Sequence, residues 1–208
     1  MKRIGRLHVL TDTTLQDRFS HLELARLAVQ GGADLIQFRQ KSGSTRSLIE
    51  TARDMKAICE AAGAVFVVND RIDVAVASDA DGVHLGQDDF PIAMARDLLG
   101  ADRIVGGSAS NLEEALACVR DGADYVGFGP VFPTTSKADA GPASGLETLR
   151  SIADAVDVPV IAIGGIDEGN AARVMDSGAH GIAVISAVCC RPDPGGAATG
   201  LCRLIQRT

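Results

Sequence analysis

The chain has 208 residues, of which 46% are hydrophobic and 23% charged, and its formal net charge is -7. This is the composition of a globular protein with a sizeable core, and the acidic balance argues against a nucleic-acid partner, because affinity for a polyanion needs an excess of Lys and Arg. No apolar run reaches the roughly 18 residues of a membrane-spanning helix, so we expect no membrane partner and a cytoplasmic location.

Short apolar segments alternate with helical patterns along the whole chain. In chain order, the expected strands are 7–10, 35–38, 65–68, 83–85, 103–106, 125–128, 160–163 and 182–185. Strands that alternate with helices indicate βαβ units and a parallel sheet. Eight such units predict an α/β fold, a (β/α)8 TIM barrel forming one domain over residues 1–208. A doubly wound open sheet is the main alternative, although no G-x-G-x-x-G motif follows the first strand.

Polar residues gather where the expected strands end, which is where the ligand site of such a barrel lies. They are Gln37, Arg39, Lys41, Asn69, Asp70, Gln87, Asp88, Asp89, Ser108, Thr134, Ser136 and Lys137. Gln37, Arg39 and Lys41 stand at every second position, so strand-like backbone would point them to the same side. Arg39 on an inward face needs an anionic partner to offset its desolvation, and both a protein carboxylate and a substrate phosphate are suitable.

Two further features favour phosphate ligands. Gly164 and Gly165 after the seventh strand, with the backbone amides of Ile185 and Ser186 after the eighth, have the pattern of the phosphate cradle of these barrels. The cations near the other strand ends would serve a second phosphate group; they are Arg39, Lys41 and Lys137.

Carboxylates among the same strand ends predict a metal site. Asp70 and Asp89 are suited to hold Mg²⁺, which takes one or two carboxylates together with water and phosphate oxygens, and Asp88 is the alternative to its neighbour. The sequence shows no Ser-His-Asp or Cys-His arrangement. A dissociating diphosphate needs its departing charge neutralised and needs no protein nucleophile.

The ordered motifs resemble the thiamine phosphate synthase family across essentially the whole chain. They are QFRQK, VVNDR, GVHLGQDD, GPVFPTTSK, IAIGGI and VISA. The resemblance implies a transferase that condenses 4-amino-2-methyl-5-pyrimidinylmethyl diphosphate with a thiazole phosphate, giving thiamine phosphate and pyrophosphate. It implies a Mg²⁺-assisted dissociation to a carbocation, which the thiazole nitrogen captures. The partners would be these two small molecules, and the sequence is also compatible with a homo-oligomer.

The resemblance also implies a role for each site residue. The pyrimidine diphosphate would be bound by Gln37, Arg39, Lys41, Asn69, Ser108 and Lys137, and Mg²⁺ by Asp70 and Asp89. The thiazole phosphate would be bound by Thr134, Ser136, Gly165, Ile185 and Ser186. The residues expected to act in catalysis are Arg39, Lys41, Lys137 and Ser108.

Three positions depart from the family pattern. Ser110 stands where the family usually has His, Ser136 replaces a more usual Thr, and His180 replaces a common Asp. One alternative function is a thiazole tautomerase of the same superfamily, which uses a His in the loop of Ser110 and lacks the second metal carboxylate. Another is a non-catalytic thiamine-pathway protein that binds phosphate ligands. Ser110 and Asp89 favour the synthase over the tautomerase, and the complete diphosphate and metal set favours it over the binding protein.

Overall fold

Within residues 2–136 and 141–206, which the computed structural model describes, eight strands form a closed parallel barrel. Each strand pairs with the next in sequence, and β8 pairs with β1. The strands are β1 (Leu7–Thr11), β2 (Leu35–Phe38), β3 (Val65–Asn69), β4 (Gly82–Leu85), β5 (Ile104–Ala109), β6 (Tyr125–Phe128), β7 (Val160–Ile163) and β8 (Gly181–Val184). The predicted barrel is confirmed, and the open-sheet alternative is wrong.

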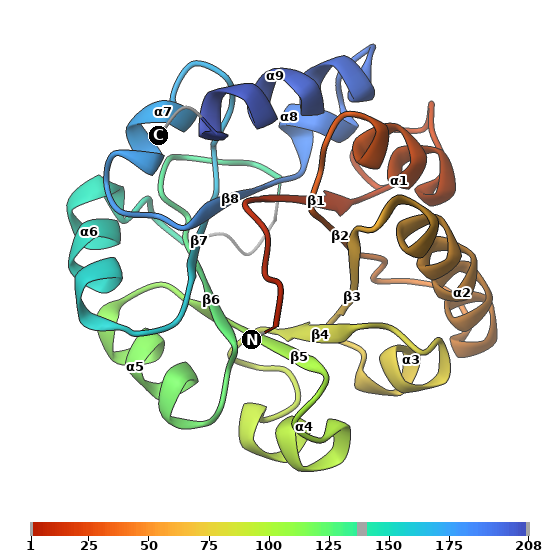
Figure 1. The fold of residues 1–208 in the computed structure, drawn as a ribbon, viewed down its shortest axis with the longest axis horizontal. Helices are drawn as coiled ribbons and strands as arrows, with labels where there is room; N and C mark the ends of the chain where they lie inside the picture. The colour runs from red at the N-terminus through yellow and green to blue at the C-terminus, as the bar shows by residue number, and fades with distance from the viewer. Residues whose placement is uncertain (1, 137–140, 207–208) are drawn as a thin grey trace.

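Helices surround the barrel on its outer side (Figure 1). They are α1 (His21–Gln30), α2 (Thr45–Ala62), α3 (Ile72–Ala77), α4 (Ile92–Leu99), α5 (Leu112–Arg120), α6 (Gly145–Ala155), α7 (Ala171–Met175), α8 (Ser186–Cys189) and α9 (Pro194–Gln206). Local signals in the sequence set several of their ends. A capping box between Ser20 and Glu23 begins α1, and Gly63, with a φ of 68°, ends α2 in the left-handed conformation. Among the described residues, no helix is both long and apolar enough to span a membrane.

The hydrophobic core has two layers, because successive side chains of a strand point to opposite faces. In β2, Ile36 and Phe38 belong to the layer between strands and helices, whereas Leu35 belongs to the layer inside the barrel. Gln37 also points inward and lines a small inner cavity. β2 ends at Phe38, so Arg39 and Lys41 lie in the following loop and do not continue the strand alternation that the sequence suggested.

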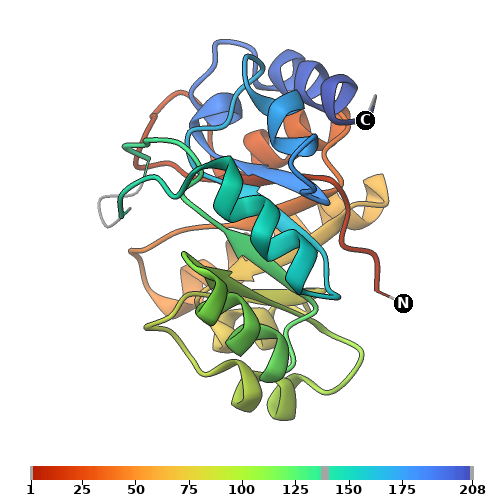
Figure 2. The ribbon, with the colours of Figure 1, turned by 90° about the vertical axis from the view of Figure 1, so that its left-hand side faces the viewer.

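The N-terminal segment lies across the end of the barrel opposite the ligand site. Figure 2 shows it leaving the barrel on the side away from the loop that precedes α6. Ile4 packs into the inner core, and Lys2 donates to both carboxylate oxygens of Asp124 at 2.8 Å. The N-terminal segment therefore covers this end of the barrel, and the C-terminal ends of the strands form the open face at the other end.

Candidate active site

A cavity of about 510 Å³ opens at the C-terminal ends of β4 to β8. Six of the predicted site residues line it: Ser108, Thr134, Ser136, Gly165, Ile185 and Ser186. Because they come from four different strand ends, only the closed barrel brings them to one cavity. This is the position at which barrels of this type bind their ligands.

One wall of the cavity is built from close backbone approaches. Gly164 and Gly165 have φ values of 100° and 64°, in the left-handed region that favours glycine. A Cβ added to Gly165 would lie 2.6 Å from the carbonyl oxygen of Pro133, so only glycine fits there. Glycine at this position lets the turn after β7 pack directly against the backbone of the loop at Pro133.

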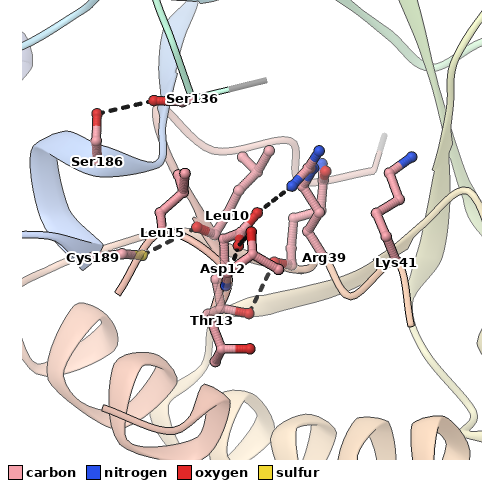
Figure 3. Close-up of polar contacts among 12 residues, drawn as sticks. Leu10, Asp12, Thr13, Leu15, Arg39, Lys41, Ser136, Ser186 and Cys189 are labelled. Atoms are coloured by element: carbon pink, nitrogen blue, oxygen red, sulfur yellow. Dashed lines mark hydrogen bonds and ion pairs between the residues drawn. The ribbon is translucent and has the colours of Figure 1, made fainter. Parts of the chain in front are cut away.

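Hydroxyl groups complete that wall. The Ser136 hydroxyl donates to the Ser186 hydroxyl at 3.1 Å, and the two residues face each other in Figure 3. The backbone amide of Ser136 donates to the Thr134 hydroxyl at 3.2 Å. The residues predicted to bind a phosphate after β6 and β8 are therefore in direct contact with each other.

A buried ion pair lies at the rim formed by β1 and β2. The Arg39 guanidinium donates to the Asp12 carboxylate, and their side chains are only 10% and 1% exposed (Figure 3). The other Asp12 oxygen accepts from the backbone amide and the hydroxyl of Thr14, at 2.8 and 2.6 Å. The anionic partner that Arg39 needs is thus provided within the protein, and Asp12 holds the guanidinium in a defined orientation.

A second group of charges lies between β3 and the loop after β4. The Lys41 ammonium donates to the Asp70 carboxylate, and Asp89 lies within hydrogen-bonding reach of the same carboxyl. Burial raises the pKa of Asp70, the neighbouring Asp89 raises this pKa further, and Lys41 opposes both effects. Asp70 also has a φ of 63°, a strained conformation for a residue other than glycine and one that is common at functional sites.

These two carboxylates fit a magnesium site. Asp89 is half-buried, and one of its oxygens accepts from the Gly86 amide at 2.7 Å, whereas Asp88 is exposed. The structure therefore brings Asp89 rather than Asp88 beside Asp70. Two facing carboxylates, one with a raised pKa, favour a bound cation. No cluster of three or more metal-ligating side chains occurs among the described residues, so such a cation would need oxygens from water or a ligand, as Mg²⁺ commonly does.

Four predicted residues remain, and one of them lies outside the described part of the chain. Gln37 is buried, and its side-chain oxygen has no hydrogen-bond partner in the described structure. Asn69 is buried at the end of β3. Ser108 lines both the main cavity and the small inner cavity beneath it. Lys137 lies outside the described residues.

Asp12, Glu114 and Tyr125 lie at the site or beneath it and are not among the predicted residues. Asp12 follows β1 in the run LTDTT, where its position after an apolar strand is a usable signal. Glu114 lines the main cavity and accepts from the amide and hydroxyl of Ser110, at 2.7 and 2.9 Å. Tyr125 is buried within the barrel and bonded to His84 at 2.9 Å, and nothing in its sequence context distinguishes it from an ordinary core residue.

The chain is similar to known proteins over nearly its whole length. The family model described as thiamine monophosphate synthase matches residues 7–188. A thiamine-phosphate synthase from Salinibacter ruber is 54% identical over 90% of this chain and 82% of the relative, and one from Chloroflexus aurantiacus is 51% identical over 98% and 94%. The structure of a thiamine phosphate pyrophosphorylase from Pyrococcus furiosus is 43% identical, covers 97% of this chain and 96% of its own, and has a TM-score of 0.90.

Proposed function

Since the chain belongs to the thiamine monophosphate synthase family, we propose that its site joins a pyrimidine diphosphate to a thiazole phosphate by a magnesium-assisted, dissociative substitution. The product would be thiamine phosphate, with release of pyrophosphate. The observation that carries the proposal is that one open face has a wall of glycines and hydroxyls on one side and two cations with their carboxylate partners on the other. Gly165 and Ser186 lie on one side, Arg39 and Lys41 lie on the other, and Ser108 lies on the floor.

The charged half would hold the diphosphate. Arg39 is oriented by Asp12, and the mostly exposed Lys41 can leave Asp70 when an anion of higher charge binds. Magnesium, when bound at Asp70 and Asp89, supplies neutralisation of the negative charge that develops on the departing pyrophosphate. Gln37 and Asn69 would contact the same substrate, and Lys137 is proposed to add a third cation. These residues bind and orient the leaving group, so no protein nucleophile is required.

The glycine-lined half would hold the thiazole phosphate. The left-handed backbone at Gly165 leaves room for phosphate oxygens, and hydroxyls of Thr134, Ser136 and Ser186 are grouped beside it. The backbone at Ile185 completes this wall. Anchoring the phosphate there would hold the thiazole nitrogen towards the floor of the cavity. Orientation of the second reactant is then the contribution of this half to the rate.

The tautomerase alternative lacks support at the position where it needs a proton-transferring histidine. Ser110 stands in the loop after β5, and its amide and hydroxyl are both bonded to Glu114. None of the described residues that line the main cavity is a histidine. The paired carboxylates beside Lys41 favour the synthase over a simple phosphate-binding protein, because they fit a metal that would neutralise the charge of a departing pyrophosphate.

A single turnover assay tests the proposal. The protein is mixed with the pyrimidine diphosphate, the thiazole phosphate and Mg²⁺, and pyrophosphate and thiamine phosphate are measured in the same sample. The proposal predicts equal amounts of the two products and little of either when Mg²⁺ is removed by chelation. Tautomerisation of the thiazole without pyrophosphate, or thermal stabilisation by the ligands without turnover, would refute it.

A further inference from the structure

A chain of hydrogen bonds runs through the barrel interior and ends at the floor of the active site. The Tyr125 hydroxyl lies 2.9 Å from Nδ1 of His84, and Nε2 of His84 lies 2.9 Å from the Ser108 hydroxyl oxygen. The three residues come from the neighbouring strands β6, β4 and β5. Tyr125 is 1% exposed and His84 is 9% exposed, so these hydrogen bonds lie almost entirely in the core. Polar groups at such depth are retained in a core only when their hydrogen bonds are satisfied.

Two glycines make the space that these side chains occupy. A Cβ on Gly106 would lie 2.2 Å from Cζ of Tyr125, and a Cβ on Gly127 would lie 2.9 Å from Cε1 of His84. The rings of Tyr125 and His84 also stack on each other, with centroids 5.4 Å apart. His8 also packs against Tyr125, in a T-shaped arrangement with 5.5 Å between the ring centroids. The position of the tyrosine hydroxyl is therefore determined by packing on several sides.

The direction of the hydrogen bonds follows from the buried phenol. Burial raises the pKa of Tyr125, so its hydroxyl keeps its proton at neutral pH. In the described part of the chain, His84 Nδ1 is the acceptor that this hydroxyl reaches, and a buried hydroxyl that donates to nothing is costly. Nδ1 of His84 is then unprotonated, and Nε2 carries the hydrogen and donates to Ser108. The Ser108 hydroxyl hydrogen is left to donate into the cavity.

We propose that Tyr125 and His84 are positioning residues that fix this direction, so that Ser108 donates its hydroxyl hydrogen to an oxygen of the departing diphosphate. The inference rests on the proposed function, because it assigns the diphosphate as the acceptor. A donor aimed at developing negative charge stabilises the transition state more than the bound substrate. The hydrogen bond from His84 also polarises the Ser108 hydroxyl and strengthens it as a donor.

A double-mutant cycle tests whether Tyr125 acts through Ser108. Tyr125→Phe should lower kcat about tenfold, the effect of one lost neutral hydrogen bond, with little change in the KM for the thiazole phosphate. Ser108→Ala should lower kcat on the order of a hundredfold. In the Ser108→Ala background, adding Tyr125→Phe should change kcat less than twofold. An equal effect of Tyr125→Phe in both backgrounds, or no effect in the natural one, would overturn the proposal.

Nitrogen-15 NMR of the histidine ring tests the hydrogen-bond direction without any activity measurement. In the ligand-free protein, His84 should be the tautomer with its hydrogen on Nε2. Tyr125→Phe should shift His84 towards a mixture of the two tautomers. A hydrogen on Nδ1 in the natural protein would refute the proposed direction of the hydrogen bonds. His180→Gln is the control, because His180 is exposed at the opposite end of the barrel and its replacement should leave kcat and the His84 signal unchanged. A protein with the predicted tautomer that forms no pyrophosphate would refute the proposed function and the role assigned to Ser108, while the tautomer itself would stand.

Discussion

The Asp12–Arg39 pair gives a prediction whose size follows from its burial. Asp12→Asn keeps an oxygen for the Thr14 amide and hydroxyl but replaces the carboxylate oxygen that Arg39 contacts by an amide nitrogen. The Arg39 side chain is 10% exposed, and its Nε is already buried with no partner in the described structure. Removing one member of a buried pair leaves an uncompensated charge, which costs about 3–5 kcal/mol. We expect a loss of this size in the free energy of unfolding.

Urea denaturation of the natural protein and the variant measures this loss. Asp73→Asn is the matched control, because it breaks the Arg71–Asp73 pair, whose side chains are 40% and 51% exposed. An exposed pair should contribute roughly 0–1 kcal/mol. Magnesium pyrophosphate should raise the unfolding temperature of Asp12→Asn more than that of the natural protein, since the bound anion replaces the lost partner. A loss for Asp12→Asn as small as that of the control would refute the reasoning.

Three further predictions concern protonation, substrate selectivity and the metal. Burial lowers the pKa of His8 from 6.5 to about 4, so the unfolded chain takes up this proton first and stability is lost as pH falls from 6.5 towards 4. His8 should contribute about 3 kcal/mol of the loss at pH 4. In urea titrations the loss should therefore be smaller by this amount in His8→Gln, where buried His21 still contributes, and parallel pH dependences would contradict the assignment. Arg39→Ala should reduce kcat far more than it weakens binding of the thiazole phosphate measured by calorimetry, and equal losses would count against its assignment to the diphosphate. Asp70→Asn and Asp89→Asn should each raise the Mg²⁺ concentration needed for half-maximal rate, whereas Asp88→Asn should not; an effect at Asp88 alone would move the metal site.

The barrel could be predicted from the sequence because every strand is a short apolar run followed by a helical pattern. β2, β6 and β7 have the expected bounds. β5 extends to Ala109, three residues beyond the expected end. The expected end came too early because the run GGS is typical of a loop. In the barrel, Gly106 is needed for the Tyr125 ring, and parallel pairing continues through Ser108 to Ala109. The glycine that suggested a strand end therefore serves packing inside the strand.

The residue types of the site could be predicted, but their partners could not. The need of Arg39 for an anion was evident from its desolvation, while the choice between a carboxylate and a phosphate was open. The pairing of β1 with β2 decides it in this structure, because the Arg39 amide donates to the Thr11 carbonyl and so places Arg39 beside Asp12, 27 residues earlier. The register between two paired strands determines which residues become neighbours, and the sequence of one strand alone does not specify this register.

A crystal structure with Mg²⁺, pyrophosphate and thiamine phosphate bound tests the central claim most directly. The account predicts a magnesium ion held by Asp70 and Asp89 and bridged to pyrophosphate, with Arg39 contacting the pyrophosphate while still bonded to Asp12. The thiamine phosphate group should lie against Gly165 and Ser186. Pyrophosphate bound away from Arg39 and Lys41, with no metal between the two carboxylates, would contradict the account.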